Sequence, residues 1–290
     1  MFTVSLIAPT GALTGDTVDE ICGAWNGQDL VWLSEREASE FALKEVPKDF
    51  WDVWEALQSR NVDMLIQPKE GRRKRMLLAD MDSTMIAQEC IDELAEEAGV
   101  GAHVKAVTAK AMNGELNFEE ALIERVALLR DLPENIVSKV IAERISLIPG
   151  GNELVATMRA NGSYAALVSG GFTAFTAYVA ETLGFDENRA NVLLAENGKL
   201  TGEVAHPILG RDAKISAMEE ITKRLGISEA DVIAVGDGAN DLGMLGRAGA
   251  GVAMHAKPSV AAQCDLRINH SDLRAILYMQ GYRAEEFLTA

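Results

Sequence analysis

The chain has 290 residues, of which 48% are hydrophobic and 24% charged, which is typical of a soluble globular protein of about two domains. Its net charge of −17, from 27 basic and 44 acidic residues, argues against general binding to nucleic acid or anionic membranes. Cys22, Cys90 and Cys264 lie far apart without metal-ligand spacing, which is typical of a reducing compartment. No apolar run approaches the ~20 residues of a membrane span, and the N-terminus lacks a signal-peptide pattern. We therefore expect a cytoplasmic protein.

Residues 1–70 form a distinct first segment that contains all four tryptophans. The segment is predicted to fold in the order β-α-β-β-α-β, over residues 3–8, 16–25, 29–33, 40–45, a stretch beginning near Pro47, and 62–67. This order predicts a small ferredoxin-like α+β domain. No ligand motif is present in it, so a packing or dimerisation role and a sensing role both stay open.

A polar, basic linker at residues 69–75 leads into the apolar run 76–79, which predicts a buried strand. Asp80 and Asp82 follow this strand, at the carboxyl end where open α/β sheets place their chemistry. An aspartate there can attack phosphorus, and a second acid beside it can protonate a leaving alkoxide. A calcium loop of the EF-hand type is excluded, because its glycine and glutamate positions hold Met85 and Ile91.

The pattern after residue 84 is helical to about residue 148 and then alternates between strands and helices. An insertion of about 60 residues is far longer than a usual βα loop, so we expect a helical cap over the strand ends. The later alternation predicts a doubly wound parallel α/β sheet. The predicted cap helices are residues 89–98, 103–112, 117–129 and 133–146. The later elements are strands 164–168, 231–235, 250–254 and 266–268, helices 152–160, 172–183, 213–225, 242–248, 259–263 and 272–280, and a hairpin of 191–195 with 199–203.

Two of the later strands end in polar groups that suit phosphate chemistry. Ser169, Gly170 and Gly171 follow strand 164–168, and their hydroxyl and backbone amides can donate to phosphate oxygens. Strand 231–235 is followed by Gly236, Asp237, Gly238, Asn240 and Asp241. This stretch is similar to the glycine-rich fingerprint of dinucleotide-binding proteins, but the third glycine is absent. Its two acids fit a metal ion better than a pyrophosphate. Mg²⁺ is the cation expected, because a carboxylate that attacks an anionic phosphate needs its charge neutralised by a hard cation.

With these motifs in this order, the chain resembles the haloacid dehalogenase superfamily of phosphatases, and more closely its phosphoserine phosphatases, from about residue 74 to about residue 277. The resemblance implies a catalytic core of residues 71–85 and 148–290 and a cap of residues 86–147. It implies that Asp80 is the nucleophile and that Asp82 is the general acid and base. The implied Mg²⁺ ligands are the Asp80 carboxylate, the Asp82 backbone carbonyl and Asp237, with Asp241 just outside them. Lys214, at the start of a predicted helix, would supply positive charge, and Asn240 would contact substrate or phosphate.

The predicted helix 117–129 carries Arg125 on the same stripe as Phe118, Leu122 and Leu129. From spacing alone, such a charge either pairs within the protein or binds an anion, and both stay open. The resemblance implies that Arg125 binds the substrate carboxylate, that Glu89 binds its ammonium group, and that Met112 and Phe118 line the pocket. The implied reaction is the hydrolysis of O-phospho-L-serine to L-serine and phosphate, the last step of serine biosynthesis.

Other functions stay open at this point. A related phosphatase or phosphotransferase could pass the phosphoryl group to another hydroxyl acceptor. A receiver-like switch also phosphorylates an aspartate at a strand end, although Asp82 and the cap weigh against it because a switch needs slow hydrolysis. Residues 1–70 are similar to the ACT-type regulatory domains of some phosphoserine phosphatases, so the chain could chiefly sense an amino acid, or could form a homodimer through this segment.

Overall fold

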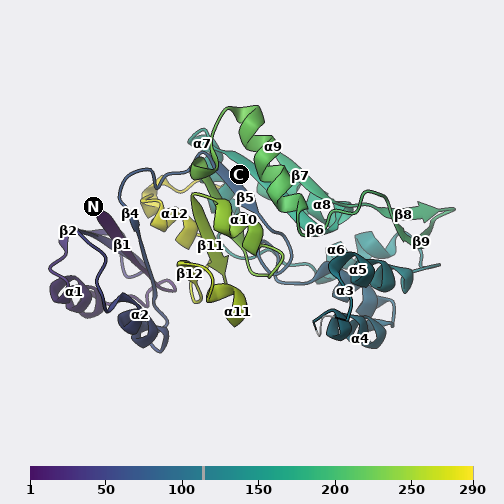
Figure 1. Ribbon diagram of the computed structural model, residues 1–290, viewed down its shortest axis with the longest axis horizontal. Helices are drawn as coiled ribbons and strands as arrows, with labels where there is room; N and C mark the ends of the chain where they lie inside the picture. Colours follow the sequence, from purple (N-terminus) through teal and green to yellow (C-terminus); the bar gives the residue numbers. More distant parts are fainter. Residues whose placement is uncertain (113–114, 290) are drawn as a thin grey trace.

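The computed structural model describes residues 1–112 and 115–289, without the side chains of residues 111 and 112. Figure 1 shows an N-terminal unit at one end, a group of helices at the other, and a larger parallel sheet between them. The predicted α/β class and doubly wound parallel sheet are confirmed. Within the described residues, no helix has the length and apolar character needed to cross a membrane.

The N-terminal unit is a four-stranded antiparallel sheet with two helices on one face. Its elements are β1 (Phe2–Ile7), α1 (Gly15–Ala24), β2 (Gln28–Ser34), β3 (Ala38–Leu43), α2 (Phe50–Gln58) and β4 (Asp63–Pro68), and the strand order is β2-β3-β1-β4. Side chains alternate along β1, so Val4 and Leu6 pack under the helices while Ile7 belongs to the main core. The order β-α-β-β-α-β is as predicted, although β3 begins two residues earlier than the predicted strand.

Polar contacts fix the N-terminal unit to the C-terminal part of the chain. The buried carboxylate of Asp63, the first residue of β4, accepts hydrogen bonds from the backbone N–H groups of Asn269, His270 and Ser271. The Gln67 side chain of the same strand donates to the Met279 carbonyl at 2.5 Å. Because a buried carboxylate needs several donors, these contacts favour one orientation of the unit on the core.

The central sheet has six parallel strands in the order β12-β11-β10-β5-β6-β7. These are β5 (Met76–Ala79), β6 (Tyr164–Phe172), β7 (Glu187–Asn191), β10 (Val232–Gly236), β11 (Ala250–Met254) and β12 (Leu266–Ile268). Alternate residues of β5 enter opposite cores: Leu77 and Ala79 face one, and Met76 and Leu78 the other. Helices α7 (Gly151–Ala160), α8 (Thr173–Leu183) and α12 (Ala275–Met279) cover the first face; α9 (Ala213–Leu225), α10 (Leu242–Arg247) and α11 (Pro258–Ala261) cover the second.

Two features of this sheet differ from the sequence prediction. Strand β7 was not predicted, because its sequence ENRAN is polar and an edge strand does not need an apolar run. Strand β6 was predicted to end at residue 168 but continues to Phe172, so Ser169, Gly170 and Gly171 lie in extended chain rather than in a turn. The β6–β7 register shifts between Val168 and Phe172, where the ladder is interrupted.

Four helices and a hairpin stand over the carboxyl ends of the strands. The helices are α3 (Cys90–Glu97), α4 (Gly101–Met112), α5 (Phe118–Ala127) and α6 (Ile136–Arg144), and the hairpin strands are β8 (Leu193–Glu196) and β9 (Lys199–Val204). Asn117 and Glu120 form a capping box at the start of α5. Leu200 exchanges backbone hydrogen bonds with Leu132 (2.9 Å) and Asp131 (3.0 Å), which ties the hairpin to the helices. We therefore propose that the cap includes this hairpin as well as residues 86–147.

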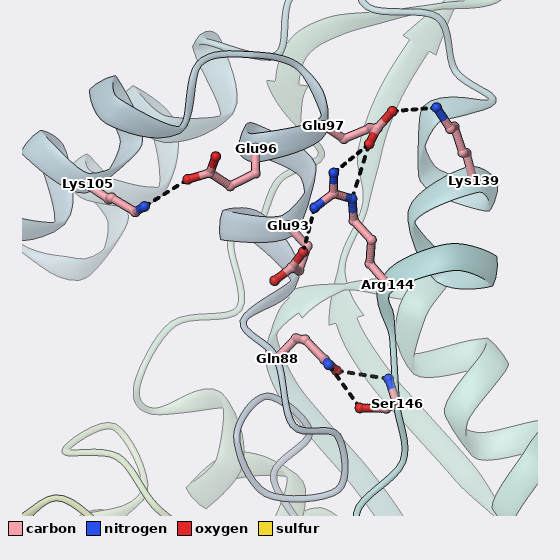
Figure 2. Close-up of polar contacts among 8 residues, drawn as sticks. All are labelled: Gln88, Glu93, Glu96, Glu97, Lys105, Lys139, Arg144 and Ser146. Atoms are coloured by element: carbon pink, nitrogen blue, oxygen red, sulfur yellow. Dashed lines mark hydrogen bonds and ion pairs between the residues drawn. The ribbon is translucent and has the colours of Figure 1, made fainter.

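The two segments that join the cap to the core run side by side. Ile86 and Leu147 form an antiparallel bridge. The Gln88 side chain donates to Ser146 Oγ and accepts from the Ser146 backbone N–H, both at 2.9 Å (Figure 2). Arg144 at the end of α6 pairs with Glu97 of α3 at 2.8 Å. The bridge and the Gln88–Ser146 contacts therefore hold the two segments that enter and leave residues 86–147 together, and the Arg144–Glu97 pair joins two helices within the cap.

Candidate active site

The sheet brings the three predicted strand ends together. β5 lies between β10 and β6, with Ala79 opposite Val235 on one side and Leu167 on the other. The residues that follow β5, Asp80 and Asp82, therefore lie beside Asp237 after β10 and Ser169 in β6. Parallel strands end at the same edge of a sheet, which is why residues some 160 positions apart in sequence form one site.

Lys214 forms buried ion pairs with two aspartates of this site. It lies in the first turn of α9, is 2% exposed, and places Nζ 2.6 Å from Asp80 Oδ1. The same ammonium group pairs with Asp241. Burial raises the pKa of Asp80, and Asp241 adds to this rise while Lys214 opposes it. A lysine in the first turn of a helix is usually solvent-exposed, and this one is instead buried between two carboxylates.

Asp80, Asp237 and Asp241 form an acidic cluster that suits a cation. One carboxylate oxygen from each lies within 4.8 Å of the others. Burial, together with Asp241 and Glu89, raises the pKa of Asp237 to about 6. Lys214 pairs with two of these three buried carboxylates, Asp80 and Asp241, and not with Asp237. An all-oxygen donor set of this kind fits a hard divalent cation.

Backbone and hydroxyl groups hold this cluster in place. Thr84 Oγ1 donates to Asp237 Oδ1 at 3.3 Å, and the Gly238 N–H donates to Asp241 Oδ2 at 2.9 Å. A Cβ at Gly236 would lie 2.4 Å from Asp241 Cγ, so only glycine fits there. Asn240 is half-buried and lies against Gly238. The glycines of this loop thus make room for acids rather than for a dinucleotide.

Asp82 is half-buried and contacts a cysteine that sequence reasoning missed. The Cys90 thiol donates to Asp82 Oδ1 at 3.0 Å. Burial, with Glu89 nearby, raises the pKa of Asp82 to about 7, and hydrogen bonds from Cys90 oppose that rise. An acid with a pKa near neutrality can both donate and accept a proton. No spacing rule pointed to Cys90, which was noted only as one of three isolated cysteines.

The Ser169–Gly171 segment is held by a second residue that the sequence did not indicate. The Ser169 hydroxyl, which is buried, accepts from the Gly171 N–H at 2.9 Å. The buried Asn191 side chain donates to the carbonyls of Gly170 (2.9 Å) and Leu209 (3.2 Å) and accepts from the Leu209 N–H (2.8 Å). Asn191 closes β7, the strand that was not predicted, so its contact could not be foreseen.

The cap residues predicted to select substrate lie above these groups. Phe118 rests on Gly170, where an added Cβ would be 2.9 Å from Phe118 Cζ. Glu89 is exposed and accepts from Ser83 Oγ at 2.8 Å, and Ser83 has a positive φ of 56°. Met112 ends α4, but its side chain lies outside the described residues.

Arg125 is half-buried in α5 and faces acids from two other segments. Burial lowers its pKa, while Asp92, Glu89 and Asp82 oppose that change. Its Nε donates to the Ala121 carbonyl at 3.1 Å. In the described part of the chain no carboxylate forms an ion pair with Arg125. The cap therefore places the Arg125 guanidinium and the Glu89 carboxylate near Asp82.

Comparison with known proteins agrees with this geometry. Residues 77–246 match the family model of haloacid dehalogenase-like hydrolases. The chain is 42% identical over 246 residues to the phosphoserine phosphatase of Archaeoglobus fulgidus, covering 84% of this chain and 69% of that one. It is 44% identical over 206 residues to the phosphoserine phosphatase of Methanocaldococcus jannaschii, covering 71% and 97%.

Solved structures agree as well. A HAD family hydrolase from Salmonella enterica serovar Typhi matches with a TM-score of 0.87 at 27% identity, over 97% of this chain and 99% of that one. A phosphoserine phosphatase solved as a phospho-aspartyl intermediate analogue matches with a TM-score of 0.66 at 44% identity, over 71% and 98%. The resemblance read from the motifs is confirmed: the chain belongs to the haloacid dehalogenase-like hydrolases and, within them, to the phosphoserine phosphatase family.

Proposed function

We propose that this protein hydrolyses O-phospho-L-serine to L-serine and phosphate, the last step of serine biosynthesis. The observation that carries the proposal is the buried cluster of Asp80, Lys214, Asp237 and Asp241 at adjacent strand ends. It occurs in a chain that is 42% and 44% identical to the phosphoserine phosphatases of Archaeoglobus fulgidus and Methanocaldococcus jannaschii. A nucleophilic carboxylate, a fixed cation and an acid of raised pKa are the groups that a phosphate monoester requires.

The first chemical step transfers the phosphoryl group to Asp80. A carboxylate oxygen of Asp80 attacks phosphorus while the bond from phosphorus to the seryl oxygen breaks. Protonated Asp82, whose pKa of about 7 leaves it partly protonated at neutral pH, gives its proton to that oxygen, and serine leaves. Lys214 offsets the negative charge, and the Ser169 hydroxyl with the Gly170 and Gly171 amides would bind the phosphate oxygens, the Gly171 N–H exchanging its acceptor in the structure, Ser169 Oγ, for a phosphate oxygen.

The second step returns the enzyme to its starting state. A water oxygen attacks the phosphorus of the phosphoaspartate, and the ionised Asp82 takes a proton from that water. The bond from phosphorus to Asp80 breaks, which frees the Asp80 carboxylate and inorganic phosphate. We propose that the Asp80 carboxylate, the Asp82 backbone carbonyl and Asp237 hold Mg²⁺, with Asp241 just outside, and that the cation reduces repulsion between Asp80 and the phosphate.

Substrate selection is proposed for the cap. Arg125 would bind the carboxylate of phosphoserine and Glu89 its ammonium group, with Met112, Phe118 and Asn240 around them. The charge arrangement supports this, because a guanidinium that forms no ion pair with any described residue and a nearby exposed carboxylate match the two ends of an amino acid.

Replacing Arg125 tests the cap assignment. We expect Arg125→Ala to raise KM for O-phospho-L-serine by about 10- to 100-fold, because the substitution removes a charge-assisted hydrogen bond to the substrate carboxylate. Release from p-nitrophenyl phosphate, which has no carboxylate, should change less than about threefold. Arg130→Ala is the matched control, because Arg130 pairs with Glu203 on the surface. An equal loss on both substrates would remove Arg125 from substrate selection.

The assembly and location remain proposals. We propose a homodimer formed through residues 1–70, supported by β2, an edge strand whose backbone can pair with a second copy and whose Leu30 is 37% exposed. Light scattering of the intact chain tests this. We also propose a cytoplasmic location, supported by three free, buried cysteines; cell fractionation with an activity assay tests it.

A further inference from the structure

Cys90 lies against the proposed general acid in a position the catalytic scheme has not used. It is the first residue of α3 and is fully buried. Its thiol is 3.0 Å from Asp82 Oδ1, and its backbone also hydrogen-bonds Asp82. The S–H donates in this contact, and the Asp82 carboxylate oxygen accepts.

The other oxygen of Asp82 faces the proposed phosphate site. Asp82 Oδ2 lies 3.2 Å from the point where a Cβ of residue 171 would stand, and Ser169 Oγ lies 3.1 Å from the same point. The thiol therefore takes one carboxylate oxygen, and the second is directed toward the Ser169–Gly171 segment. The torsion that rotates an aspartate carboxylate has broad, shallow minima, so an external contact is needed to fix it.

We infer that Cys90 is a positioning residue, whose S–H···O hydrogen bond to Asp82 Oδ1 keeps Oδ2 directed at the oxygen of the leaving group. The inference rests on the proposed role of Asp82 as general acid. Cys90 itself contacts neither substrate nor the reacting atoms. Its loss should affect the step that needs a proton from Asp82 more than binding or nucleophilic attack.

Leaving groups of different acidity separate this role from a merely structural one. The seryl oxygen of O-phospho-L-serine must be protonated as it leaves, whereas p-nitrophenolate leaves as a stable anion. The readout is the ratio of kcat/KM for phosphoserine to kcat/KM for p-nitrophenyl phosphate. We expect Cys90→Val, which fills the buried position with methyl groups and has no donor, to lower this ratio at least about tenfold, since general acid catalysis is typically worth about 10²- to 10⁴-fold.

A conservative variant and a matched control accompany this measurement. Cys90→Ser keeps an O–H donor and should hold the ratio within about threefold of the unmodified protein. Cys264→Ala changes another buried cysteine, in the opposite core, and should leave the ratio unchanged. If Cys90→Val does not fold, Cys90→Ala removes the same donor. Thermal unfolding of each variant shows whether it is folded under the conditions of the assay, and the ratio is compared only for folded variants.

Asp82→Asn separates failure of the inference from failure of the proposed function. It should lower the ratio at least as far as Cys90→Val. If Asp82→Asn leaves the ratio unchanged, the general-acid role proposed for Asp82 is wrong. If Asp82→Asn lowers it while Cys90→Val and Cys90→Ala do not, Cys90 has no positioning role and the catalytic scheme stands.

Discussion

Asp80→Asn is expected to abolish phosphate release, with a loss of at least about 10⁴-fold in kcat, because an amide cannot attack phosphorus as a carboxylate does. The variant should remain folded, since it removes one of three clustered buried carboxylates and so reduces their repulsion. Acid-quenched unmodified protein given phosphoserine labelled in its phosphate should retain label, and the variant should retain none.

The matched control for this substitution is Asp16→Asn, an exposed aspartate in the first turn of α1. It should keep full activity, which shows that the loss depends on position rather than on one unit of charge. A folded Asp80→Asn protein that kept more than about 1% of the activity would rule out Asp80 as the nucleophile.

Removing divalent cations is expected to stop turnover, and the concentration of Mg²⁺ that restores half of it should depend on pH. The pKa of Asp237 is raised to about 6, so this carboxylate is ionised above that pH and protonated below it. Protons and Mg²⁺ compete for the same oxygens, and the half-saturating Mg²⁺ concentration should therefore rise as pH falls through about 6. Titrating activity with Mg²⁺ from pH 5 to pH 8 measures this.

The same raised pKa has a consequence for stability. A buried acid whose pKa is higher in the folded state stabilises the fold when protonated, and that contribution is lost as pH rises through about 6. The metal-free protein should thus have a higher thermal midpoint at pH 5 than at pH 7, and Asp237→Asn should reduce the difference without removing it, because Asp80 and Asp82 also have raised pKa values and contribute with the same sign. For the Mg²⁺ titration, a half-saturating concentration that stayed constant from pH 5 to pH 8 would contradict a cation held by Asp237. The control for both measurements is Asp265→Asn, which removes a carboxylate at an exposed site.

The apolar strands of the central sheet were predictable, because buried parallel strands are continuous apolar runs such as Met76–Ala79. The polar edge strand β7 was not predictable from the sequence. It pairs with β6 along one edge and faces solvent along the other, so its residues need not be apolar. The attachment of the β8–β9 hairpin to the cap depends on packing between segments about 70 residues apart, which no local pattern records. Local signals therefore predicted the apolar strands, whereas strand β7 and the position of the hairpin depend on long-range contacts.

Some residues of the candidate site could likewise be predicted from local sequence patterns, and others could not. Asp80, Asp82 and Asp237 could be found from the sequence because each follows an apolar strand, where parallel sheets gather polar groups. Lys214 had no such signal and depended on the family resemblance, yet it is buried between two of the aspartates. Cys90 and Asn191 make hydrogen bonds that depend on how the chain folds, Cys90 to Asp82 and Asn191 to Gly170 and Leu209, and no sequence pattern indicates such contacts.

The central claim is that this protein releases phosphate from O-phospho-L-serine. The most direct test is the initial rate of phosphate release by the intact chain with Mg²⁺, compared with the rate from O-phospho-L-threonine under the same conditions. We predict release from phosphoserine with one serine formed per phosphate, at least about tenfold faster than from phosphothreonine, whose extra methyl group must fit beneath the cap. No release from phosphoserine, alongside Asp80-dependent release from p-nitrophenyl phosphate, would contradict the substrate assignment and leave only the catalytic core.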